Sequence, residues 1–100
     1  MGLNWFDAAK AKEFGTALGS FFIEKLPVDS SQKIDDDHFA RKTKKVLTNM
    51  AEQVEEFKKQ NKLNIYKRAQ LSNAFKWTLK EAGYAPEYVN ELTMWLVRLL

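Results

Sequence analysis

Apolar residues that recur every three or four positions are the feature of this 100-residue chain that most limits its fold. Such spacing places side chains on one face of an α-helix, and no segment alternates apolar and polar residues for long enough to indicate a strand. Only four glycines and two prolines interrupt the pattern. The sequence therefore predicts an all-α protein: one helical domain, residues 1–100, forming a compact four-helix bundle with helices at roughly 5–26, 35–60, 64–82 and 86–100.

Residues that start or stop helices set these boundaries. Pro27 should end the first helix, because its ring disfavours helical geometry in the preceding residue. The consecutive aspartates at 35–37 suit the start of the second helix, where carboxylates cap free amides and oppose the positive end of the dipole. Asn64 can cap the third helix, Gly83 can close it, and Pro86 fits the first turn of the fourth.

Each predicted helix has an apolar face that we expect to form the core. These faces are, in chain order, Phe14, Leu18, Phe21, Phe22 and Leu26; Phe39, Thr43, Val46, Leu47, Met50, Val54 and Phe57; Ile65, Leu71, Phe75, Leu79 and Ala82; and Tyr88, Val89, Leu92, Trp95, Leu96, Leu99 and Leu100. On the first helix, Ala11, Gly15 and Gly19 recur every four residues. Small side chains at this spacing predict that the backbone of a neighbouring helix approaches closely.

Composition excludes several kinds of site. The absence of cysteine rules out disulfides, thiolate metal ligands and a thiol nucleophile. Net charge is +3, a weak bias toward anionic partners. The N-terminal residues lack the pattern of a signal peptide, and no apolar run approaches the roughly 18 residues that a membrane span requires. We therefore expect a cytoplasmic protein.

No catalytic or metal-binding motif stands out. The aspartates at 35–37 and His38 form the only acid–histidine cluster, but consecutive side chains fan out around a helix start and do not converge on a metal. Nucleophile-elbow and glycine-rich phosphate-binding motifs are absent from the sequence. We expect no metal, no cofactor and no catalysis. An enzyme whose site is assembled from distant residues is the least favoured hypothesis.

Two further binding classes are alternatives. The basic run at 41–45 could follow phosphates, but Glu52, Glu55 and Glu56 interrupt the basic surface of the same helix, so a nucleic-acid partner is unfavoured. Aromatic residues on the first helix allow a membrane-surface location, although its polar face is mixed and not richly basic. The alternative function is thus a peripheral membrane binder or a non-specific nucleic-acid binder.

A polar and aromatic stripe on the third helix is the main functional signal. It consists of Tyr66, Gln70, Asn73 and Trp77, on the side away from the apolar face. An exposed indole has to be covered, either by another helix of the chain or by a partner, and the sequence leaves both open. Trp and Tyr are favoured anchors in protein interfaces.

The fourth helix adds a second group of candidate contact residues. Its apolar arc is widened by aromatic side chains and continues to the last position of the chain. The residues of this group are Tyr88, Trp95, Leu96 and Leu99. With the stripe, they predict a small helical protein-association module, either a homo-oligomer such as a homodimer formed through the fourth helix or an adaptor for a larger partner.

Overall fold

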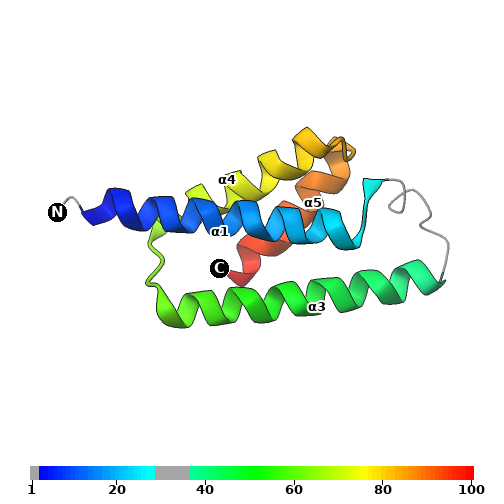
Figure 1. Cartoon of the computed structure of the whole chain (residues 1–100), viewed down its shortest axis with the longest axis horizontal. Coiled ribbons are helices and arrows are strands. Elements are labelled where there is room, and N and C mark those ends of the chain that lie inside the picture. The colour runs from blue at the N-terminus through cyan, green and yellow to red at the C-terminus, as the bar shows by residue number, and fades with distance from the viewer. Residues whose placement is uncertain (1–2, 29–36) are drawn as a thin grey trace.

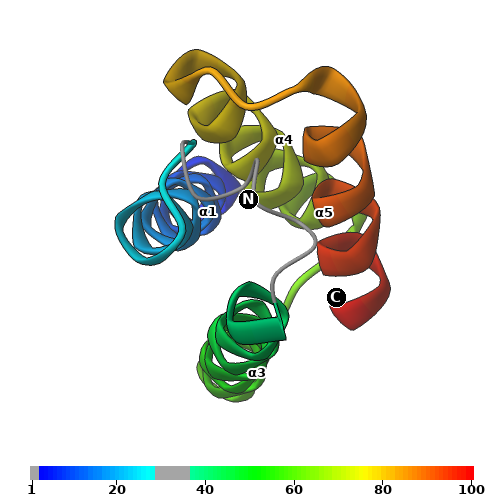
Figure 2. The ribbon, with the colours of Figure 1, turned by 90° about the vertical axis from the view of Figure 1, so that its right-hand side faces the viewer.

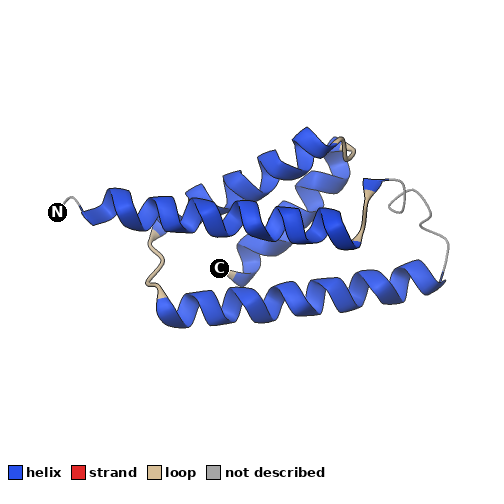
Figure 3. Cartoon of the chain, in the orientation of Figure 1, coloured by secondary structure: helices blue, strands red, loops and turns tan. Residues whose placement is uncertain are grey.

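A computed structural model describes the backbone of residues 3–28 and 37–100 and the side chains of residues 8–28 and 41–100. Its helices are α1 (Leu3–Lys25), α3 (Asp37–Gln60), α4 (Ile65–Ala82) and α5 (Pro86–Leu99) (Figure 1). Figure 3 shows that these described segments contain helices and loops and no strand. The predicted all-α four-helix fold is confirmed. Capping by Asp35 and Asp36 lies outside the described residues, as do the side chains of Asp37, His38 and Phe39.

Helices α1 and α4 pack against each other through glycine. A Cβ atom added at Gly15 would lie 2.1 Å from the carbonyl oxygen of Leu71, and one added at Gly19 would lie 2.8 Å from Cβ of Thr78. Any larger side chain at these positions would force the two backbones apart. The close approach predicted from the small residues of the first helix is therefore confirmed, and its partner is α4.

The predicted caps of α4 and α5 are also confirmed. Asn64 accepts a hydrogen bond from the backbone amide of Lys67 at 2.8 Å, which satisfies a free amide in the first turn of α4. Gly83 ends this helix with φ = 101°, a left-handed conformation that favours glycine, and its amide donates to the carbonyl of Lys80 at 3.1 Å. Pro86 occupies the first turn of α5, so the chain folds back after a three-residue link.

The core lies between all four helices. Its largest fully buried side chains are Phe22, Phe75, Leu18, Leu26, Met50, Leu71, Leu79, Leu96, Val54 and Val89. Figure 2 shows α1, α4 and α5 grouped together, with α3 lying along one side of them. The ring of Phe57 on α3 stacks on Phe14 of α1 with centroids 4.2 Å apart. Most of the predicted apolar faces thus point inward.

Two residues predicted to face the core do not. Ile65 is 83% exposed and Ala82 is exposed, so the prediction for these positions is wrong. They are the first and last residues of α4, and periodicity predicts the direction of a side chain but not how far a neighbouring helix extends to cover it. Conversely, Ser72 and Ala74 are buried, because the small residues of α1 bring the two backbones together on this side of α4.

Candidate functional site

The predicted stripe on α4 lies on the outside of the folded chain. We refer to Tyr66, Gln70, Asn73 and Trp77 as the α4 face. Tyr66 is 58% exposed and Trp77 is 56% exposed, while Asn73 is exposed and Gln70 half-buried. None of the described helices covers the indole, so the part of the chain that the structure describes leaves it open to a partner.

A hollow of about 480 Å³ borders Trp77 between α4 and α1. Its lining residues are Gln70, Asn73, Ala74, Trp77, Thr78 and Glu81 from α4 and Lys12 and Thr16 from α1. The glycine contacts hold the two helices close enough for side chains of both to share this hollow. The hydroxyl of Thr78 already donates to the carbonyl of Ala74 at 2.7 Å. The side-chain amides of Gln70 and Asn73, the ammonium group of Lys12 and the carboxylate of Glu81 therefore remain available to contact a partner.

A positive charge lies beside the exposed indole. The Lys80 ammonium lies 4.8 Å from the centroid of the Trp77 ring, a cation–π distance. Helix α4 carries four basic residues (Lys67, Arg68, Lys76 and Lys80) and one acidic residue (Glu81). Helix α4 is thus predominantly basic, and one of its cations lies against the exposed indole.

Tyr88, predicted as a contact residue, is half-buried and packs against the core. Its ring lies 5.9 Å from that of Tyr84, nearly parallel, and 6.1 Å from that of Phe22 on α1. The buried hydroxyl of Tyr84 donates to the carbonyl of Leu26. Burial, with the neighbouring Tyr88, raises the pKa of Tyr84 to about 12, and burial also raises the pKa of Tyr88. This aromatic cluster fastens the end of α1 to the start of α5.

The remaining predicted residues of the fourth helix separate into two environments. Leu96 is fully buried in the core, which corrects its prediction as a contact residue, since no partner can reach it while the bundle is intact. Trp95 and Leu99 are half-buried and line a groove of about 390 Å³ between α5 and α3. Lys58 of α3 donates to the carbonyl of Leu99 at 2.8 Å and holds one end of this groove. The α4 face and the predicted contact residues of α5 thus do not form one continuous surface.

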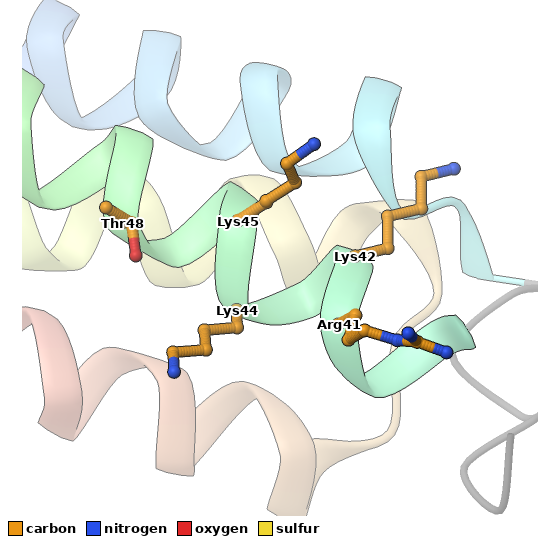
Figure 4. A pocket seen from close by; sticks show the side chains of 5 residues that line it. All are labelled: Arg41, Lys42, Lys44, Lys45 and Thr48. Atoms are coloured by element: carbon orange, nitrogen blue, oxygen red, sulfur yellow. The ribbon is translucent and has the colours of Figure 1, made fainter. Parts of the chain in front are cut away.

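A third hollow, of about 710 Å³, lies at the first half of α3. It is lined by Arg41, Lys42, Lys44, Lys45 and Thr48 (Figure 4). All five are exposed. The basic run recognised in the sequence therefore borders a hollow, which residue spacing alone does not reveal.

Sequence reasoning missed the α1 side of the site. Lys12 and Thr16 were not predicted as contact residues, although they face Trp77 across the hollow. Gly15 and Gly19 indicated that some helix packs on α1, but they did not identify α4 as that helix. To predict Lys12 and Thr16, the sequence would have had to indicate that α1 packs against α4.

The described residues lack two further features, a metal-ligand cluster and a membrane-spanning helix. They contain no group of three or more His, Asp or Glu side chains placed to hold a metal ion, and no buried polar side chain among them lacks a hydrogen-bond partner. None of the described helices combines the length and the apolar character needed to cross a membrane. Comparison with protein-family models, curated proteins and solved structures finds no match to this chain.

Proposed function

We propose that the chain is a small helical protein-association module that binds an acidic partner protein through the α4 face. The observation that carries the proposal is Trp77, 56% exposed beside a hollow that two helices share. Burying a large indole supplies much of the energy of an interface, and hot spots are enriched in Trp and Tyr. Such a module acts by binding and needs no catalytic group, and we place it in the cytoplasm.

The charges support a different protein as the partner over a second copy. Lys80 over the indole and Lys12 in the hollow favour carboxylates on the incoming surface, which would also speed association. Two copies paired through their α4 faces would bring two basic helices together, with only Glu81 as an acidic residue on each. A partner segment that combines acidic and apolar side chains suits this surface better.

Affinity capture with paired variants tests the proposal. The tagged chain, Trp77→Ala and Met94→Ala would each be incubated with lysate of the source cells, and bound proteins would be cross-linked and identified. Met94 on α5 is a matched control because it is also 56% exposed. We expect a partner with an acidic segment, cross-linked to α4, to be retained by wild type and by Met94→Ala. Trp77→Ala should lose it, with a binding loss of about 2 kcal/mol or more.

Urea denaturation of the same variants separates a lost contact from a damaged fold. An exposed side chain contributes little to the monomer, so Trp77→Ala should change the free energy of unfolding by about 0.5 kcal/mol or less. Equal capture by the two variants would refute the proposal. A loss of about 3 to 5 kcal/mol in the unfolding free energy of Trp77→Ala would also refute it, because that is the cost of truncating a buried Trp. Light scattering that shows a dimer abolished by Trp77→Ala would identify a second copy as the partner instead.

A further inference from the structure

Four cations within five positions form a compact surface on the first half of α3. The members of this basic cluster are Arg41, Lys42, Lys44 and Lys45. Figure 4 shows Lys42 and Lys45 extending on one side of the helix and Lys44 on the other. All four are exposed and border the hollow of about 710 Å³.

No acidic side chain is paired with the basic cluster in the part of the chain whose side chains are described, residues 8–28 and 41–100. None of its members forms an ion pair there, whereas later in α3 Lys58 lies 3.6 Å from Glu55. Arg41 and Lys45 are four residues apart, and Lys42 and Lys45 are three apart. Like charges at these spacings destabilise a helix by about 0.2 to 0.5 kcal/mol per pair. A bound anion would remove this repulsion.

The length of the basic cluster along the helix axis limits the size of the anion that it can bind. At about 1.5 Å rise per residue, Arg41 and Lys45 are separated by about 6 Å along the helix axis. Arginine and lysine are the side chains that bind phosphate oxygens, Arg as a planar fork and Lys as a point charge. Beyond the cluster, Glu52, Glu55 and Glu56 are exposed on the same helix and would repel a longer polyanion. The surface therefore fits a few closely spaced phosphates better than an extended nucleic acid.

We infer that the basic cluster of α3 binds a compact group of clustered phosphates, carried either by a phosphorylated lipid headgroup or by a free polyphosphate. The Thr48 hydroxyl, which lines the same hollow, can donate a further hydrogen bond to a phosphate oxygen. This site uses none of the residues of the α4 face. It can hold a ligand whether or not the chain binds an acidic protein.

Calorimetric titration with inorganic tripolyphosphate tests the inference. The probe would be added to wild type, to a cluster variant with Arg41, Lys44 and Lys45 changed to Ala, and to a control with Lys59, Lys62 and Arg68 changed to Ala. Both variants lose one arginine and two lysines that are exposed, so their net charges are equal. The cluster variant should bind about tenfold more weakly or worse, while the control stays close to wild type.

Vesicle co-sedimentation then distinguishes the two sources of phosphate. Binding to phosphatidylcholine vesicles only when they contain a phosphoinositide, with tripolyphosphate as a competitor, identifies a headgroup. Binding of free tripolyphosphate alone identifies a soluble ligand. Equal losses of tripolyphosphate affinity in the cluster and control variants would refute the site. So would the absence of tripolyphosphate binding to wild type at physiological salt. Tighter binding of single-stranded DNA than of tripolyphosphate would also contradict it. Circular dichroism of both variants verifies that the exposed substitutions leave the helices intact.

Discussion

Tyr84 and Trp77, two aromatic residues seven positions apart, have opposite environments. Tyr84 is 4% exposed, its hydroxyl donates to Leu26, and its ring contacts Phe22. Trp77 is 56% exposed, and the ammonium of Lys80 lies 4.8 Å from its ring centroid. The first side chain therefore contributes to stability, while the second remains available to a partner. Aromatic content alone could not separate these roles, because it does not say which rings find a neighbour within the chain.

Tyr84 should make stability depend on alkaline pH. Its pKa is about 12 in the folded chain against a usual value of 10.0, so the neutral hydroxyl is favoured by folding. Its contribution is complete below pH 10 and should be lost as the pH rises from 10 to about 12, with the raised pKa of Tyr88 acting in the same direction. Urea denaturation across this range should show a shallower fall in unfolding free energy for Tyr84→Phe than for wild type.

The exposed Tyr66 provides the control for this titration. Tyr66→Phe makes the same change of side chain at a residue that is 58% exposed. At neutral pH, Tyr84→Phe should cost about 1 kcal/mol, since the carbonyl of Leu26 loses its donor. Identical pH profiles for the two variants would show that burial of Tyr84 is not the cause.

At the scale of helices, the contact between α1 and α4 was predictable only in part from the sequence. Helix ends were predictable because Asn64, Gly83 and Pro86 act on their own local backbone. A close helix contact was predictable from Gly15 and Gly19. The identity of the opposing helix was not, because several helices present apolar faces of similar width and periodicity does not pair them.

Gly15→Ala tests the importance of this contact. On a free helix the change would stabilise by about 1 kcal/mol, because alanine has the higher helix propensity. Here the new Cβ would lie 2.1 Å from a backbone oxygen of α4, so we expect a net loss of about 1 to 3 kcal/mol in urea denaturation. Ser20→Ala, at an exposed position of α1, should stay within about 0.5 kcal/mol of wild type. A Gly15→Ala protein as stable as wild type would contradict the close packing.

In the molecule as a whole, the predicted contact residues occupy separate places. Tyr66 and Trp77 lie on the outside of α4, Trp95 borders the groove between α3 and α5, and Leu96 is in the core. The apolar arc of the fourth helix is wide, so spacing could not tell which part of it the other helices would fill. Exposure of the stripe on α4 was not predictable, because a helix at the centre of a small bundle can be covered on two sides.

Fluorescence quenching can show whether the α4 face is open in the free chain and covered in a complex. A variant with Trp5→Phe and Trp95→Phe would retain Trp77 as its sole tryptophan, with circular dichroism to verify the fold. Acrylamide should quench this fluorescence strongly in the dilute free protein, and adding the captured acidic partner should reduce the quenching. An indole already shielded in the dilute chain, or one equally accessible in the complex, would contradict a docking surface on α4.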